Sequence, residues 1–527
     1  MIQSPTLSRS EGAARSRDGA PAWFRLAAGI AIALSLGLSL TVTSPRGIGL
    51  SPDSVSYLAA ARNLAAGEGF RSFDGQPVTL WPPLYPALLA ALHGLTGAEL
   101  LATGRWLHAG LLIATLGLTT ALAVRLASDE WLVALTIIGV AGLSPFLWPF
   151  SALLLSEGLF ACLVLLLVMA LAGDRPSWRA IAFGGVIAAA LGLTRYIGIA
   201  FVVAGALALV LGGPEPPARR ALKAALFASV AALPWLLWLG RNAWLYGSAM
   251  GPRYPSVYGL GENLRFTLET LLQMILVGPL ARPAIAATLL LPAAVAAALV
   301  LRRSFAPPRP GASKLRRTLL IFISVYLAFL IATSTTSAYD RISVRLVMPV
   351  FAPLILLLGD VAAGVLRRLR AMPDGRALRV LAGGAALLVV GMAAARGVEE
   401  IGDMRATGLG YHSANWAESP TLALAIANRA LLESERVFSN DPPALYLYLD
   451  LIAEETPRRT AHNSTAILVP AAALDAAWPP APGVVVWFAA NSGDTDFYAL
   501  DDLAAAAEMS PLAAASDGAL YRVASEP

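Results

Sequence analysis

The chain has 527 residues, of which 57% are hydrophobic and only 14% are charged, and its mean hydropathy is +0.65. A soluble chain of this length needs far more charge to cover its surface. The composition therefore excludes a disordered scaffold, a collagen and a cytosolic enzyme, and it indicates a polytopic α-helical membrane protein. A single cysteine, Cys162, excludes a disulfide framework and a thiolate metal site.

Apolar runs predict about eleven transmembrane helices. A polar tail over residues 1–21, expected to be cytoplasmic, precedes the first run at Ala22–Thr43. A large first extracytoplasmic loop over residues 44–99 follows, with an amphipathic helix at Ser54–Ala66 and a short apolar helix at Pro82–Gly97. The other spans are predicted at Leu100–Leu126, Trp131–Phe146, Ser151–Ala172, Arg179–Leu193, Tyr196–Leu211, Ala221–Leu239, Ala284–Leu301, Leu319–Ala338, Leu346–Leu366 and Val380–Ala395. An odd number of spans places the two termini on opposite sides of the membrane.

The net charge of +5 follows from the distribution of basic residues among the loops. With the N-terminus inside, every dense basic loop falls in the cytoplasm, as the positive-inside rule requires. The excess positive charge is therefore explained by topology, and no nucleic-acid partner is predicted. These loops carry Arg175 and Arg179; Arg219, Arg220 and Lys223; Arg302, Arg303, Arg309, Lys314, Arg316 and Arg317; and Arg367, Arg368, Arg370, Arg376 and Arg379.

The residue composition changes after the predicted transmembrane region, which covers residues 22–395. Charged residues, Asp and Asn become frequent, and short runs typical of β-strands occur at Arg436–Ser439 and Val484–Phe488. Helical stretches such as Thr421–Ser434 separate them. Residues 396–527 are therefore predicted to form a small α/β domain, which the topology places outside the cytoplasm.

The informative polar residues lie at the predicted outer ends of the spans, where a charge costs free energy without assisting insertion. They are Asp53, Tyr57, Glu157, Arg195, Tyr196, Arg241, Arg253, Arg341 and Arg345. Several arginines can bind the oxygens of a lipid-linked phosphate, and a carboxylate can take a proton from an attacking hydroxyl or amine. The combination indicates a site for an anionic lipid-linked substrate at the outer interface.

Each of these residues also has a structural interpretation. Asp53 could N-cap the following helix, and Glu157 could complement a helix dipole. The side chains of Arg195, Arg241 and Arg253 could extend along the helices to the interface. Arg341 and Arg345 could pair with Asp340 or bind lipid headgroups. The joint placement of all of them on one face carries the functional interpretation.

The chain resembles the GT-C superfamily of membrane glycosyltransferases, in particular the group of dolichyl-phosphate-mannose protein mannosyltransferases and the lipid A aminoarabinose transferase. The resemblance covers roughly residues 22–395. It rests on Pro52-Asp53 with Tyr57 and Gly67-Glu68-Gly69-Phe70, Trp81-Pro82-Pro83-Leu84-Tyr85-Pro86, Ser156-Glu157, Leu193-Thr194-Arg195 and Arg345-Leu346-Val347-Met348-Pro349.

The resemblance implies an inverting transfer from a polyprenyl-phosphate-linked sugar to a lipid, glycan or protein acceptor at the outer face of the bacterial cytoplasmic membrane. It assigns the acid–base or acceptor-positioning role to Asp53. The mannosyltransferases have a glutamate directly after this aspartate, whereas this chain has Ser54, so protein mannosylation is disfavoured. No cofactor is predicted. Some superfamily members use a divalent metal, but the nearest further carboxylate in the loop is Asp74, so a metal is not favoured.

Two other classes of function remain as alternatives. A transporter or flippase of a lipid-linked or anionic solute predicts ionisable residues along a path through the middle of the membrane, whereas most predicted spans carry no charge at their centres. A structural or assembly protein with an outer partner-binding domain leaves the first-loop aspartate and the outer arginines unexplained.

Overall fold

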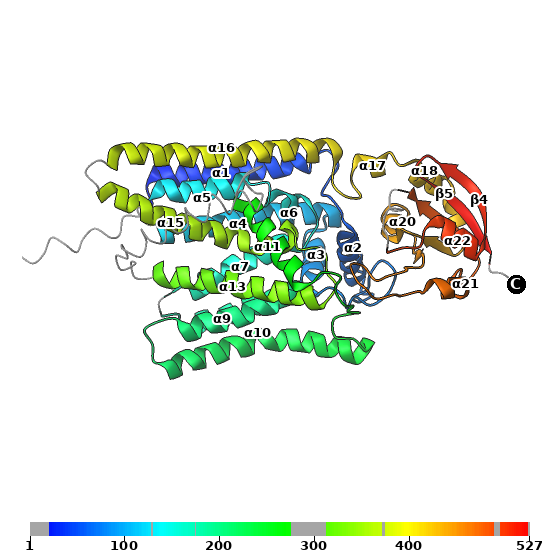
Figure 1. Cartoon of the computed structure of the whole chain (residues 1–527), viewed down its shortest axis with the longest axis horizontal. Helices are drawn as coiled ribbons and strands as arrows, with labels where there is room; N and C mark the ends of the chain where they lie inside the picture. The colour runs from blue at the N-terminus through cyan, green and yellow to red at the C-terminus, as the bar shows by residue number, and fades with distance from the viewer. Residues whose placement is uncertain are drawn as a thin grey trace, which may run out of the picture.

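The computed structural model describes residues 20–127, 130–173, 175–275, 312–371, 375–489 and 496–524. Long helices run side by side in a bundle, and a small mixed domain lies at one end of it (Figure 1). Within the described residues, six helical segments are long and apolar enough to span a membrane. They are α1 (Ala22–Val42), α4 (Leu100–Ala127), α10 (Pro217–Tyr246), α13 (Ala312–Thr336), α16 (Gly375–Thr407) and the segment Val344–Arg368, which joins α14 (Val344–Val347) to α15 (Phe351–Ala371).

Shorter apolar helices are also present among the described residues, and all but the first of them fall on predicted spans. They are α3 (Leu84–Thr96), α5 (Trp131–Leu143), α7 (Glu157–Leu171), α8 (Trp178–Thr194) and α9 (Ile199–Leu211), the last preceded by the 3-10 turn η1 (Tyr196–Gly198). Large apolar side chains of α10 and α16, such as Leu233 and Leu387, are exposed, as expected of surfaces that face lipid. The predicted span Ala284–Leu301 lies outside the described residues, and the count of about eleven spans stays a prediction.

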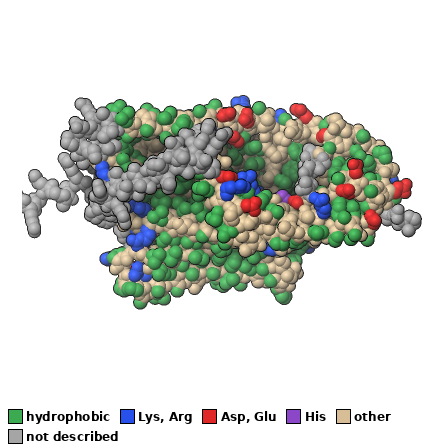
Figure 2. All heavy atoms as spheres, in the orientation of Figure 1, with side chains coloured by type: hydrophobic (Ala, Val, Ile, Leu, Met, Phe, Trp, Pro, Cys, Tyr) green, Lys and Arg blue, Asp and Glu red, His purple; other side chains and the backbone are tan. Residues whose placement is uncertain are grey.

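The helices of the first loop lie at the end of the bundle that is next to the C-terminal domain (Figure 1). The predicted amphipathic helix is α2 (Pro52–Ala65), and the short apolar helix is α3 (Figure 1). The amphipathic helix α11 (Leu260–Ile275), packed on α13 and α14, was not predicted from the sequence. Lys and Arg side chains gather at the opposite end of the bundle (Figure 2).

One predicted span begins later than expected. Residues 151–156 were included in the span Ser151–Ala172, but the chain forms the short helix α6 (Trp148–Ala152), then becomes extended, and α7 begins only at Glu157. The extended segment pairs with the loop that follows α1: Gly49 N donates to Ala152 O at 2.7 Å, and Leu154 N donates to Gly49 O at 3.0 Å. These backbone bonds compensate for those that the helix gives up, and they bring Ser156 and Glu157 close to α2.

The C-terminal domain contains a five-stranded sheet in the order β2-β1-β3-β5-β4. Strands β2 (Glu454–Glu455), β1 (Val437–Ser439) and β3 (Gly483–Phe488) are parallel, whereas β5 (Gly518–Ala524) is antiparallel to β3 and β4 (Glu508–Ala515). Both faces of β3 are buried: Val484 and Val486 belong to the core that continues into the bundle, and Val485 and Trp487 to a separate core. A strand buried on both faces explains the continuous apolar run that predicted it.

Short helices cover the sheet and connect its strands. They are α17 (Ala414–Ala417), α18 (Pro420–Ala427), α19 (Arg429–Ser434), α20 (Pro442–Leu449), α21 (Leu474–Ala477) and α22 (Leu500–Ala506), with the 3-10 turns η3 (Met348–Val350) in the bundle and η4 (Ala471–Ala473) in the domain. The predicted domain start at residue 396 falls inside α16, which continues to Thr407. The polar residues after 395 therefore extend the last long helix beyond its apolar part before the domain begins.

Gly410 joins the first loop to the segment that enters the C-terminal domain. Its φ is +57°, it pairs with Leu50 in a parallel bridge, and a Cβ added to it would lie 1.8 Å from the carbonyl oxygen of Leu50. We expect Gly410→Ala to lower the free energy of unfolding by about 2 kcal/mol or more, measured as the midpoint of thermal unfolding. The matched control is Gly402→Ala in α16, where an added Cβ meets nothing within 4 Å; it should be neutral or stabilising by up to about 1 kcal/mol. Equal midpoints for the two variants would contradict this assignment.

Candidate active site

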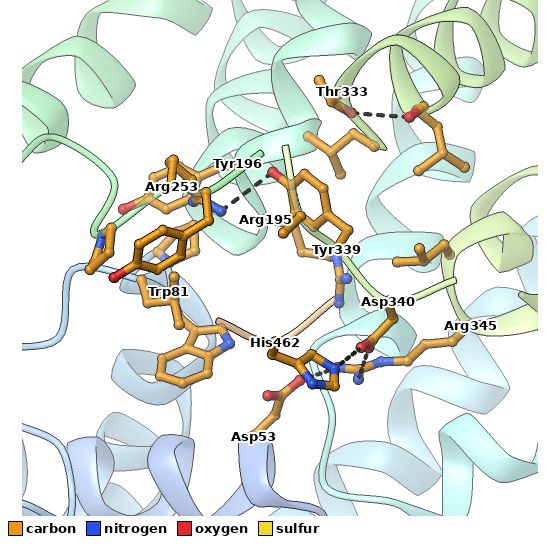
Figure 3. A pocket seen from close by; sticks show the side chains of 18 of the residues that line it. Asp53, Trp81, Arg195, Tyr196, Arg253, Thr333, Tyr339, Asp340, Arg345 and His462 are labelled. Carbon is orange, nitrogen blue, oxygen red and sulfur yellow. Dashed lines mark hydrogen bonds and ion pairs between the residues drawn. The ribbon is translucent and has the colours of Figure 1, made fainter. Parts of the chain in front are cut away.

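A cavity of about 450 Å³ lies where the bundle meets the C-terminal domain (Figure 3). Several separate parts of the chain line it: the first loop with α2, the α8–η1 junction, the loop that precedes α11, α13 with the segment that follows it into α14, and a loop of the C-terminal domain. Among its lining residues are six of the predicted site residues, namely Asp53, Tyr57, Arg195, Tyr196, Arg253 and Arg345. The tertiary structure therefore gathers residues that are up to 292 positions apart in the sequence.

The carboxylate of Asp53 reaches the cavity from the first turn of α2. The N-cap of α2 is Ser51, whose hydroxyl accepts from Ser54 N at 3.3 Å, while the hydroxyl of Ser54 accepts from Ser51 N at 2.9 Å. This capping box satisfies the backbone amides of Ser51 and Ser54, so the helix has its N-cap without Asp53. Its side chain is 25% exposed and accepts a hydrogen bond from Nη2 of Arg345.

Arg345 lies at the centre of the charged groups. It is carried by the short helix α14, and its side chain is 27% exposed. In addition to the bond to Asp53, Nε donates to Glu157 Oε1 at 2.6 Å, and Nη1 lies 3.6 Å from Asp340 Oδ2. One cation therefore faces three carboxylates that come from three distant segments.

Glu157 lies beneath the cavity and does not line it. Its side chain is 1% exposed, and Oε1 is shared by Arg345 and by Arg195, whose Nη1 lies 2.7 Å away. Nη1 of Arg195 also donates to the hydroxyl of Ser156 at 3.2 Å. Breaking either buried pair would leave an uncompensated charge, which is costly. Glu157 therefore holds both arginines in place.

Both tyrosines predicted for the site, Tyr57 and Tyr196, line the cavity. The hydroxyl of Tyr57 lies 3.3 Å from the hydroxyl of Ser156, and burial, with the charge of Asp53 as a smaller cause, raises the pKa of Tyr57 above its usual value. Tyr57 is therefore a neutral hydrogen-bonding group at physiological pH. Tyr196 donates its hydroxyl proton to Thr79 O at 2.7 Å, and its ring lies 5.8 Å from the guanidinium carbon of Arg253.

Besides Glu157, two further predicted site residues, Arg241 and Arg341, do not line the cavity. The guanidinium of Arg241 lies 4.9 Å from the Trp238 ring, and it donates to Asn242 Oδ1 at 3.0 Å. Arg341 points away to α11, where it donates to Glu269 Oε2 at 3.1 Å and stacks on Phe266. For Arg241 the side chain is held along α10 by aromatic contacts, and for Arg341 the amphipathic helix α11, absent from the sequence prediction, supplies the partner.

The structure adds residues to the cavity that were not predicted as site residues, among them Trp81, Tyr339, Asp340, Arg458 and His462. The sequence suggested Asp340 only as a partner of Arg341 or Arg345, and the structure gives it to Arg345. A Trp-Pro-Pro motif directly preceding a helix was the signal that could have identified Trp81. His462 carried no such signal, because it reaches the cavity only through the folding of the C-terminal domain.

The described residues contain no group of three or more His, Cys, Asp or Glu side chains placed to hold a metal ion. Metal independence stays a prediction from the sequence.

No family model matches this sequence, and no curated protein matches it. The fold is similar to solved structures. The structure of ArnT from Cupriavidus metallidurans in the apo state aligns with a TM-score of 0.56 at 14% identity, covering 94% of this chain and 97% of that one. The same protein bound to undecaprenyl phosphate aligns with a TM-score of 0.53 at 14% identity over 96% and 98% of the two chains. The arabinofuranosyltransferase AftD from Mycobacteria aligns with a TM-score of 0.52 at 18% identity, covering 95% of this chain but 40% of that one. The chain is therefore a polytopic helical membrane protein with the fold of the GT-C glycosyltransferases.

Proposed function

We propose that this protein is an inverting glycosyltransferase that moves a sugar from a polyprenyl-phosphate donor to an acceptor at the outer face of the bacterial cytoplasmic membrane. The N-terminus is then cytoplasmic and the C-terminal domain extracytoplasmic. The observation that carries the proposal is the convergence of one partly exposed carboxylate, Asp53, with the guanidinium groups of Arg195, Arg253 and Arg345 on one cavity.

The charge arrangement suits the chemistry of this transfer. Breaking the bond between sugar and phosphate leaves extra negative charge on the phosphate, which fixed guanidinium groups stabilise. Arg195 and Arg345 are fixed from below by the buried Glu157, and Arg253 approaches over Tyr196 from the opposite wall. These groups are preorganised, so little free energy is spent on orienting them when the donor binds.

Asp53 is the base in this proposal. Its carboxylate takes the proton of the acceptor hydroxyl or amine as that group attacks the anomeric carbon from the side opposite the phosphate. In the structure Asp53 is paired with Arg345. A donor phosphate competes for the same guanidinium, so donor binding would release the carboxylate for the acceptor.

Features of the surroundings support a lipid donor. The cavity lies at the end of the bundle, beside helices whose exposed apolar side chains include Leu236 and Leu237 of α10, so an isoprenoid tail can lie against the bundle while its phosphate reaches the arginines. ArnT has been solved with undecaprenyl phosphate, and the archaeal oligosaccharyltransferase AglB with an inhibitory peptide and a dolichol phosphate. The acceptor is proposed to be a lipid, glycan or protein that enters from the side of the C-terminal domain.

The proposal is tested by incubating the purified protein with a panel of labelled polyprenyl-phosphate sugars and extracted membrane acceptors. We expect label to appear in an acceptor fraction with one donor, and slow release of free sugar from that donor without acceptor. Sugar 1-phosphates lacking the polyprenyl chain serve as controls and should not be consumed. No turnover with any lipid-linked donor, or equal use of the water-soluble controls, would contradict the proposal.

A further inference from the structure

A loop of the C-terminal domain reaches the cavity and is fixed by hydrogen bonds to the loop that precedes α11. Ser464 donates its hydroxyl proton to Pro255 O at 2.6 Å, and Val257 N donates to Asn463 O at 3.1 Å. These bonds do not involve the imidazole of His462, which projects from the same loop into the cavity (Figure 3). A side-chain change at residue 462 therefore leaves the anchoring of the loop in place.

The imidazole of His462 lies between two carboxylates. Nδ1 is 2.9 Å from Asp496 Oδ2, and Nε2 is 3.2 Å from Asp340 Oδ1. The hydrogen bond with Asp340, and then that with Asp496, raises the pKa of His462 to about 9 against an opposing effect of burial. The charged form is therefore the one present at neutral pH. Arg458, on the same loop, is held elsewhere, by an ion pair with Glu455 and by stacking on Phe497.

Asp340 is shared between this imidazolium and the central arginine. Its Oδ1 faces His462, while its Oδ2 lies 3.6 Å from Nη1 of Arg345 (Figure 3). A separation of 3.6 Å is too long for a hydrogen bond. Asp340 thus forms an ion pair with the guanidinium but makes no hydrogen bond to it.

Nη1 is the one guanidinium nitrogen of Arg345 that makes no hydrogen bond within the described part of the chain. Nε is bonded to Glu157 and Nη2 to Asp53. Since Arg345 lines the cavity, Nη1 is the nitrogen most readily offered to an incoming phosphate oxygen, and Asp340 is its competitor.

We infer that His462 is a positioning residue, which holds the Asp340 carboxylate off Arg345 and so keeps Nη1 available to the phosphate of the donor. This inference rests on the proposed function. Without the imidazolium, Arg345 is the only cation that Asp340 pairs with among the described residues. The carboxylate then closes the gap, occupies Nη1 and opposes phosphate binding. The C-terminal domain would thereby complete the donor site.

The test measures binding of polyprenyl phosphate to the full-length protein in bilayer discs of zwitterionic lipid. We expect His462→Gln to weaken binding about tenfold, the loss of one charge-assisted hydrogen bond to phosphate. Asp340→Asn should bind at least as tightly as the unmodified protein, and adding Asp340→Asn to His462→Gln should restore binding, because an amide does not compete for the guanidinium. His93→Gln is the control, since His93 bonds Ala98 O in the first loop and does not line the cavity.

A purely structural role for His462 predicts a different pattern, because removing Asp340 would then leave the affinity of the double variant as low as that of His462→Gln. That result overturns the inference, as does equal binding by His462→Gln and the unmodified protein. Absence of polyprenyl phosphate binding by the unmodified protein would instead overturn the proposed function on which the inference rests.

The pH dependence of polyprenyl phosphate binding provides an independent test of the inference. A folded-state pKa raised from 6.5 to about 9 means that the favourable His462 pairing is complete below about pH 6.5 and is lost as the pH rises through 9. A phosphate monoester already carries its second charge above about pH 7.5, so a fall in affinity between pH 7.5 and 10 reports the imidazole. We expect this fall in the unmodified protein and a flatter profile in Asp340→Asn; identical profiles would contradict the inference.

Discussion

Asp53→Asn is expected to abolish sugar transfer while leaving the fold intact. The amide has nearly the same shape as the carboxylate but cannot accept the proton of the acceptor, and loss of a general base costs about 10²- to 10⁴-fold in rate. Since the hydroxyl groups of Ser51 and Ser54 cap α2, the substitution removes no cap. Turnover of the donor identified by the transfer assay is the measurement.

Binding separates this prediction from a structural effect. Asp53 occupies Nη2 of Arg345, so its neutralisation removes one competitor for the guanidinium, and Asp53→Asn should bind polyprenyl phosphate as tightly as the unmodified protein or more tightly. Asp74→Asn is the control: Asp74 is in the same loop, and its carboxylate accepts from Gln76 N at 3.0 Å outside the cavity. Undiminished turnover by Asp53→Asn would remove Asp53 from the role of base.

Glu157→Gln is expected to be the most destabilising of the substitutions at the site. The carboxylate is 1% exposed and compensates the charges of Arg195 and Arg345. Removing one partner of a buried ion pair leaves uncompensated charge, which costs about 3–5 kcal/mol. The measurement is the midpoint of thermal unfolding in detergent, together with the yield of folded protein.

The control for this substitution is Glu399→Gln. Glu399 is exposed on α16, and a surface change of this kind stays within about 0.5 kcal/mol. If Glu157→Gln unfolded at the same temperature as Glu399→Gln, the two arginines would not depend on Glu157 for compensation, and Glu157 would have no central role in fixing the site.

Local features of the sequence determined most of the elements of the fold. Runs of apolar residues long enough to cross a bilayer predicted the helices of the bundle, because the hydrocarbon interior requires every backbone group to be bonded within its segment. The same reasoning was wrong at residues 153–156, which were predicted to belong to a transmembrane helix. There, backbone hydrogen bonds to the first loop replace helical ones. It also failed for α11, since an amphipathic helix shows no long apolar run.

The sequence also identified which ionisable residues needed an explanation. Asp53, Arg195 and Arg345 stood out because charges at the outer ends of apolar spans do not assist insertion, and the structure places all three on the cavity. Arg241 and Arg341 satisfied the same criterion and yet lie elsewhere. Position along a span fixes the depth of a side chain but leaves open which neighbour it faces.

Only the tertiary structure decided the partners. Arg345 faces Asp53 and Glu157 across 292 and 188 positions of sequence, and His462 joins the site from a separate domain. Hydropathy and helix caps are properties of neighbouring residues and can be recognised along the chain. A contact between distant segments depends on how helices pack and where a domain docks, and no local pattern records it.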